Sequence, residues 1–143
     1  MTALLKSLRL ALVAALVALA APAFAGDKVV YHIDDSAVQA TKALRNIRNH
    51  LDTAPDTKVT VVTHADGVDF LFDGAKDPKS GAEYAPLISG LKANGVAFEV
   101  CEITMKRRNL TREKFVMDAD FTPSGVVRLT ELQARDHFAY IKP

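Results

Sequence analysis

Cys101, the only cysteine of the chain, is the residue best suited to nucleophilic chemistry. It ends the apolar run at residues 96–101 (VAFEVC), which has the composition of a buried strand. Lys106, Arg107 and Arg108 follow within a short expected helix. Amide groups at a helix start and nearby cations stabilise the thiolate, which is the nucleophilic form of cysteine. The same residue also fits a second interpretation, in which the cysteine packs as a small hydrophobic side chain.

Polar residues follow the other apolar runs as well. His64 comes directly after residues 58–63 (KVTVVT) and is a candidate base or ion partner for Cys101, or alternatively a polar cap of the next turn. Ligands of open parallel sheets bind at the carboxyl ends of the strands. The candidate binding residues at such positions, or just beyond them, are Asp34, Gly67, Thr104, Lys106 and Ser124. Two adjacent aspartates at residues 34–35 are also typical of a turn and helix cap, and His32 is expected to be a satisfied core histidine.

Several kinds of chemistry are excluded by composition and spacing. One cysteine forms no internal disulfide and supplies no cysteine cluster for zinc or iron–sulfur. The Cys and His spacing offers no recognisable metal-ligand set. No Walker loop, GxGxxG fingerprint or GxSxG elbow is present, so no classical catalytic motif supports an enzyme. The net charge of +1 gives no basic excess for nucleic acid. We expect neither a metal nor another cofactor.

Strands and helices alternate along the chain. Ala40, Leu44, Ile47 and Leu51 repeat with helical spacing, after a capping box formed by Ser36 and Gln39. A second helix is expected from about residue 85 and a third from about residue 126. The expected strands are residues 28–33, 58–63, 96–101, 120–122 and 138–141. Strands joined through helices are parallel crossovers. The sequence therefore predicts one α/β domain, a three-layer α/β/α arrangement with a mostly parallel sheet of about five strands.

Residues 1–25 have the organisation of a secretory signal peptide. Lys6 and Arg9 provide a positive start, residues 10–20 form an uncharged apolar run, and residues 23–25 read AFA. Cleavage is expected between Ala25 and Gly26, which leaves residues 26–143 as the mature domain. The alternative is an uncleaved anchor, although the run is shorter than the roughly 20 residues that span a bilayer. We therefore expect a periplasmic protein with no membrane contact after cleavage.

The mature sequence resembles the DsrE/DsrF-like family, in particular its exported members of unassigned function. The resemblance covers nearly all of residues 26–143 and lies in residues 28–33, 61–67, 91–101, 104–105, 123–133 and 139–143. It implies a small α/β/α domain that assembles into homo-oligomers, often trimers or hexamers. Cys101 falls where the exported relatives carry their cysteine. Ile103 departs from the pattern, because relatives often have asparagine just before the position of Thr104.

Two functions follow from these observations. In the first, the protein is a sulfur carrier or thiol relay. Cys101 accepts a sulfur atom, which it holds as a persulfide, and His64 tunes the thiolate. Thr104 and Lys106 would then contact an anionic group, and a partner protein would give or take the sulfur. In the second, the protein is a non-catalytic oligomeric module that binds a small anion or a partner protein, and Cys101 only packs. Native-state reactivity of the thiol distinguishes the two functions.

Overall fold

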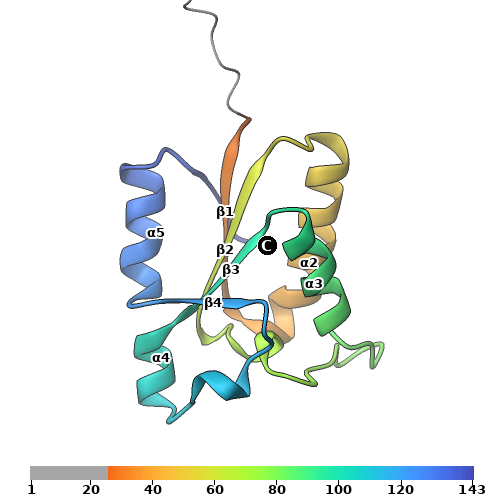
Figure 1. Ribbon diagram of the computed structural model, residues 1–143, viewed down its shortest axis with the longest axis vertical. Helices are drawn as coiled ribbons and strands as arrows, with labels where there is room; N and C mark the ends of the chain where they lie inside the picture. The colour runs from red at the N-terminus through yellow and green to blue at the C-terminus, as the bar shows by residue number, and fades with distance from the viewer. Residues whose placement is uncertain (1–25) are drawn as a thin grey trace, which may run out of the picture.

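Five parallel strands form one sheet at the centre of the computed structural model, which describes residues 26–143 (Figure 1). The order of the strands across the sheet is β4-β3-β2-β1-β5, and every pairing between them is parallel. The strands are β1 (Lys28–Asp35), β2 (Lys58–Asp66), β3 (Ala97–Cys101), β4 (Ala119–Thr122) and β5 (Ala139–Ile141). The prediction of a parallel five-stranded sheet is confirmed. The expected signal peptide lies outside the described residues.

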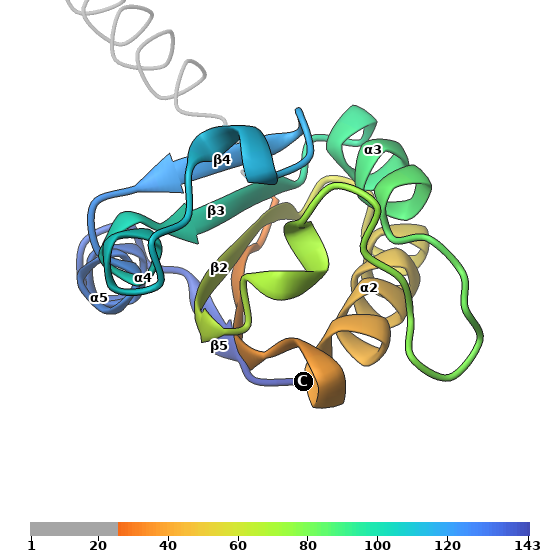
Figure 2. The same ribbon diagram turned by 90° about the horizontal axis from the view of Figure 1, so that it is seen from below.

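Helices cover both faces of this sheet, as the three-layer prediction requires. Helices α2 (Ser36–Thr53) and α3 (Ala85–Ala93) lie on one face, and α5 (Gly125–Ala134) lies on the other (Figures 1 and 2). The short helix α4 (Glu102–Arg107) follows β3 directly and lies on the side of α5. Two 3-10 turns, Asp69–Leu71 and Arg112–Lys114, complete the connections. Within residues 26–143, no helix combines the length and apolar character needed to cross a bilayer.

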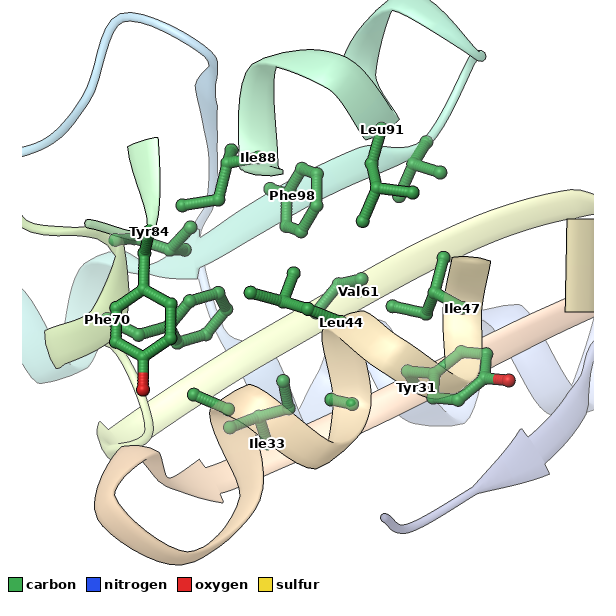
Figure 3. Packing of buried hydrophobic residues seen from close by; sticks show 14 of the residues in the cluster. Tyr31, Ile33, Leu44, Ile47, Val61, Phe70, Tyr84, Ile88, Leu91 and Phe98 are labelled. Carbon is green, nitrogen blue, oxygen red and sulfur yellow. The ribbon is translucent and has the colours of Figure 1, made fainter. Parts of the chain in front are cut away.

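The alternation of side chains along the strands divides the core into two parts. On the face of α2 and α3, a large cluster includes Tyr31, Ile33, Val61 and Phe98 (Figure 3). On the face of α5, a smaller cluster consists of Val30, Val62, Leu129, Leu132 and Phe138. Both faces of β1 and β2 are buried over most of their length, which explains why these two strands are nearly continuous apolar runs. The smaller cluster leaves room on the α5 face for polar residues at the carboxyl ends of the strands.

The start of α2 differs from the expected capping box. Asp35, not Ser36, is the N-cap, and its carboxylate accepts a hydrogen bond of 3.2 Å from the N–H of Val38. The Gln39 side chain accepts from the N–H groups of Asp34 and Asp35, while the Ser36 hydroxyl accepts from the N–H of Phe70. The helix therefore begins at Ser36, one residue earlier than a Ser36 cap would place it, directly after the last residue of β1 that pairs with β2.

A forked ion pair ties α5 to β3. The Arg128 guanidinium donates to both carboxylate oxygens of Glu99, over 2.8 and 3.0 Å, and the Glu99 side chain is only 12% exposed. We expect Arg128→Ala to lower the free energy of unfolding by about 2 kcal/mol, because it leaves a mostly buried carboxylate without its partner. Lys76→Ala removes a well-exposed pair with Glu83 and should change stability by less than about 0.5 kcal/mol. Urea unfolding measures the free energy of unfolding of both variants, and an equal loss of stability in the two would contradict the prediction.

Candidate functional site

Cys101 lies where β3 ends and α4 begins, on the α5 face of the sheet. It is the last residue of β3 and the N-cap of α4, and it is 4% exposed. Val100 packs into the core under α2 and α3, so Cys101 points to the opposite face. A Cβ placed on Gly125 would lie 3.3 Å from the Cβ atoms of both Cys101 and His64. The structure therefore brings the cysteine and the histidine together beside the first residue of α5.

Hydrogen-bond donors from two helix starts surround the sulfur. Burial opposes ionisation of Cys101, but the N–H groups of Gly125, Thr104 and Ile103 and the Thr104 hydroxyl favour the thiolate, and their sum lowers the pKa of the thiol. Gly125 opens α5, and Ile103 and Thr104 lie in the first turn of α4. Backbone N–H groups at helix starts carry partial positive charge. These donors thus stabilise an anion at the sulfur.

A pocket of about 420 Å³ opens beside the thiol, which is a volume typical of small-molecule sites. Ile103 and Val126, both exposed, form an apolar part of its wall. Among residues 26–143, no Asp or Glu lines the pocket, whereas two arginines do. The lining residues are His64, Ala65, Cys101, Ile103, Thr104, Arg107, Arg108, Ser124 and Val126. This composition favours a ligand with negative charge and some apolar surface.

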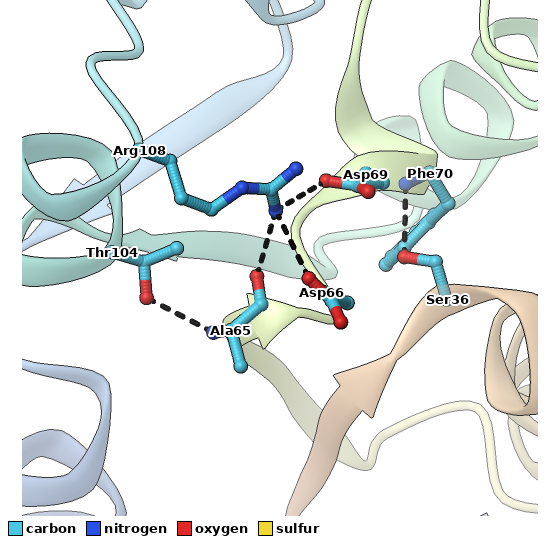
Figure 4. A network of polar contacts seen from close by, with 7 residues as sticks. All are labelled: Ser36, Ala65, Asp66, Asp69, Phe70, Thr104 and Arg108. Carbon is cyan, nitrogen blue, oxygen red and sulfur yellow. Dashed lines mark hydrogen bonds and ion pairs between the residues drawn. The ribbon is translucent and has the colours of Figure 1, made fainter.

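The two arginines of the pocket differ in their partners. Arg108 donates to the carbonyl oxygen of Ala65 over 3.1 Å and to Asp69 over 2.6 Å, and Asp66 lies 3.6 Å away (Figure 4). The carboxylate of Asp69 raises the pKa of Arg108. These contacts hold the end of α4 against the end of β2, and the two carboxylates compensate the positive charge of Arg108. Arg107 makes no ion pair with the residues that the structure describes, so its charge is available to a ligand.

Thr104 connects the same two elements at the thiol itself. Its hydroxyl oxygen accepts a hydrogen bond of 3.0 Å from the N–H of Ala65, at the end of β2 (Figure 4). The hydroxyl hydrogen is then free to point to the sulfur of Cys101, in keeping with its effect on the thiol pKa. Thr104 is buried, and its one hydroxyl serves both as an acceptor and as a donor.

His64 is held by a second histidine. Its Nε2 lies 2.7 Å from Nε2 of His32, and Nδ1 of His32 lies 2.6 Å from the hydroxyl of Tyr140. Burial lowers the pKa of His64; Lys142 lowers it further and Asp34 opposes the shift. His64 is accordingly a neutral imidazole at pH 7, so the thiolate has no imidazolium partner. His32 is half-buried with both ring nitrogens hydrogen-bonded.

Three of the residues named from the sequence lie outside this pocket. Asp34 pairs with Lys142 over 2.6 Å, an interaction that lowers the pKa of the Asp34 carboxyl. Gly67 contacts the end of β1 through its backbone, and Lys106 is exposed beyond the lining. Thr104 and Ser124 do line the pocket, and Ser124 also caps α5. No group of three His, Cys, Asp or Glu side chains within residues 26–143 is arranged to hold a metal.

Sequence reasoning did not foresee the roles of Gly125, His32 and Tyr140, and it named Arg107 only as one of three adjacent cations. Gly125 brings an N–H group to the sulfur, Arg107 supplies the unpaired cation, and His32 and Tyr140 hold His64. Helical phase was a usable signal for Arg107, because Ile103 and Arg107 are four residues apart and share a face of α4. No local signal points to Tyr140, because it lies 108 residues from its partner.

Comparison with known proteins places the chain in a family. The model of the DsrE/DsrF-like family matches residues 6–143. The solved structure of MTH1491 from Methanobacterium thermoautotrophicum, a protein of unknown function, is 26% identical with a TM-score of 0.71, and the alignment covers 82% of this chain and 99% of that one. The YchN protein from E. coli shares the fold at 14% identity, with a TM-score of 0.68 and the same coverage. No curated protein matches. The family match over nearly the whole sequence, together with the shared five-stranded architecture, shows that the chain belongs to the DsrE/DsrF-like family.

Proposed function

We propose that the protein is a sulfur carrier in which Cys101 accepts a sulfur atom as a persulfide and passes it on. The observation that carries the proposal is the set of N–H and O–H donors around a thiol whose pKa is lowered although it is buried. The Cys101 thiolate attacks the outer sulfur of a persulfide or polysulfide, and the donor leaves as a thiolate. One S–S bond forms and one breaks, so the transfer needs no external oxidant or cofactor.

The charges of the pocket support an anionic sulfur donor. Arg107 offers a cation without an internal partner, and the amides that stabilise the thiolate equally stabilise a persulfide anion on the same residue. Ile103 and Val126 give the donor an apolar surface to pack against. His64 lines the same pocket, and its lowered pKa makes it a neutral imidazole at pH 7, so we propose that it acts on the thiol as a neutral polar group.

Mass spectrometry of the intact protein tests the proposal. After exposure to polysulfide, the wild type is expected to gain the mass of one sulfur atom, which dithiothreitol removes. Cys101→Ser and iodoacetamide-treated wild type should gain nothing. Iodoacetamide should also modify Cys101 in the folded protein. The sulfur-carrier function would be contradicted if the wild type gained no mass, or if Cys101→Ser gained the same mass as the wild type.

The second candidate is a binding module in which Cys101 only packs. Its support is the low exposure of Cys101 and the exposed Val126 and Val127 at the start of α5. In that case iodoacetamide reacts with Cys101 only in urea, and Cys101→Ser leaves anion binding in the pocket unchanged. Alkylation of the native protein therefore decides between the two functions.

We also propose that residues 1–25 direct export to the periplasm and that the mature domain forms a trimer or hexamer. The support is the charged, apolar and AFA segments of the N-terminus and the family resemblance. A sulfur-transfer partner protein would then meet Cys101 in the same compartment. Periplasmic fractionation and light scattering of the mature protein test these two points, with cytoplasmic retention and a monomer as the contrary results.

A further inference from the structure

Three hydrogen-bonding side chains form a continuous line across β5, β1 and β2, on the same face as Cys101. Tyr140 pairs with Val30 in the sheet, and His32 lies two residues further along β1 on the same face. His32 pairs with Val62, and His64 lies two residues further along β2. The line is therefore diagonal and advances toward the carboxyl ends of the strands. Its inner end, His64, lines the pocket of Cys101, and its outer end, Tyr140, is 43% exposed.

Both histidines in this line are neutral at pH 7. Burial, His64 and Lys142 lower the pKa of His32 to about 4, against the opposing effect of Asp34. The pKa of His64 is lowered as well. Each neutral imidazole carries one proton, so the contact of 2.7 Å between the two Nε2 atoms holds a single proton. The hydrogen bonds along the line must consequently all run in one direction or all in the other.

The two directions present opposite groups to the pocket. In the outward direction, His64 donates from Nε2 to His32, His32 donates from Nδ1 to Tyr140, and Nδ1 of His64 is a free acceptor. In the inward direction, Tyr140 donates to Nδ1 of His32, His32 donates from Nε2 to His64, and Nδ1 of His64 carries a proton. An acceptor at Nδ1 matches a thiol in the pocket, and a donor matches a thiolate.

We propose that Tyr140, His32 and His64 form a proton path that carries the thiol proton of Cys101 to the exposed edge of the sheet. The proton of Sγ passes to Nδ1 of His64, directly or through a bridging water. The Nε2 proton of His64 moves to Nε2 of His32, the Nδ1 proton of His32 moves to Tyr140, and the tyrosine hydroxyl releases its proton to solvent. The line changes from the outward to the inward direction, and no imidazolium forms.

This path fits the low pKa of both rings. A cationic histidine would be costly in these half-buried positions, and a shift of neutral tautomers avoids it. His64 is the residue at the pocket, whereas His32 and Tyr140 act through it as positioning residues. The inference rests on the reactive thiol of the proposed function, but it requires only that Cys101 ionises and needs no sulfur donor.

The other charged groups near the path are arranged in pairs. Asp34 of β1 binds Lys142, which follows β5, and Glu99 of β3 binds Arg128 of α5. At the end of α4, the cap residue Arg108 binds Asp69. Arg107 is the remaining cation among the residues that line the pocket. Carboxylate, lysine and arginine side chains ordinarily titrate outside the range between pH 6 and 9. A change in the histidine tautomers over this range therefore reports ionisation of the thiol.

Nitrogen NMR of the histidine rings tests the path without any sulfur compound. As pH rises through the thiol midpoint, measured by ultraviolet absorbance of the thiolate, His64 should change from the Nε2–H to the Nδ1–H form. His32 should change from Nδ1–H to Nε2–H at the same midpoint. In Cys101→Ser neither ring should change. His50, which contacts Tyr31 on the opposite face, should keep its tautomer in both proteins. A ring of the pair that keeps one tautomer across the midpoint overturns the path.

A variant that keeps the hydrogen bond but stops the proton gives a second test. The amide of His32→Gln can bond to His64 yet cannot relay a proton, so persulfide formation at pH 7 should slow about 10-fold. His50→Gln is the matched control and should leave the rate unchanged. An unchanged rate in folded His32→Gln, with the wild-type melting temperature, contradicts the path. If the wild type takes up no sulfur at all, the sulfur-carrier function fails while the NMR result still decides the path.

Discussion

Gly67→Ala is expected to lower the free energy of unfolding by about 3 kcal/mol, at the upper end of typical overpacking costs. Gly67 lies just after β2, where the chain passes the end of β1. A Cβ there would overlap the carbonyl oxygen of Ile33 and lie 2.5 Å from its carbonyl carbon and 2.7 Å from Cα of Asp34. All three neighbours are backbone atoms, which cannot rotate aside as a side chain would. Either the end of β1 or the turn from His64 to Gly67 must move.

The matched control is Gly90→Ala in α3. A Cβ on Gly90 meets nothing within 4 Å, and alanine has a higher helix propensity than glycine. This variant should gain about 0.5–1 kcal/mol, because alanine loses less backbone entropy on folding. Urea unfolding of both variants measures the difference between them. If the free energy of unfolding of Gly67→Ala lies within about 0.5 kcal/mol of the wild-type value, the end of β1 can move to accommodate the methyl group, and the prediction is wrong.

The layers of the fold follow from local patterns that are visible in the sequence. Apolar runs at β1 and β2, each followed by a helix, already require a sheet covered on both faces. The position of Cys101 at the end of β3 follows from the same pattern, and the structure confirms it. Helix α3 begins at Ala85 as expected, because Pro86 is tolerated only in the first turn.

Pairing between strands decided what the sequence left open. Strand β1 continues to Asp35 and β2 to Asp66, although their last residues are polar, because the two strands pair with each other there. The same pairing makes Gly67 a point of close backbone contact with the end of β1. The pairing of β5 with β1 likewise brings Tyr140 and His32 together diagonally. Contacts of this kind depend on register between distant segments, which composition and spacing do not encode.

Helical phase explains why Arg107 and Arg108, and not Lys106, reach the pocket. Helix α4 begins at Glu102, and positions four residues apart share a face. Arg107 therefore lies one helical turn after Ile103, and Arg108 lies one turn after Thr104. All four residues line the pocket. Lys106 lies above Glu102 on a different face. The sequence showed three adjacent cations, but only the exact start of the helix determines which of them face the thiol.

Thr104→Val is expected to slow alkylation of native Cys101 by iodoacetamide about 10-fold at pH 7. The hydroxyl of Thr104 stabilises the thiolate and so lowers the pKa of the thiol. Valine keeps the shape and removes that donor, so the pKa rises and less thiolate is present below it. A hydrogen bond to a charged group contributes about 1.5–3 kcal/mol, of which 1.4 kcal/mol corresponds to a factor of 10. Stability should fall by about 1 kcal/mol, because the N–H of Ala65 also loses its acceptor.

The pH dependence separates this electrostatic effect from a blocked pocket. Well above both thiol pKa values the wild type and Thr104→Val are fully ionised, so their alkylation rates should converge. Thr104→Ser keeps the hydroxyl and should stay close to the wild type at every pH. Thr130→Val removes a hydroxyl that bonds to the backbone on the exposed side of α5, and it should not change the rate. A deficit of Thr104→Val that persists at high pH would mean that the threonine governs access to the sulfur and not its charge.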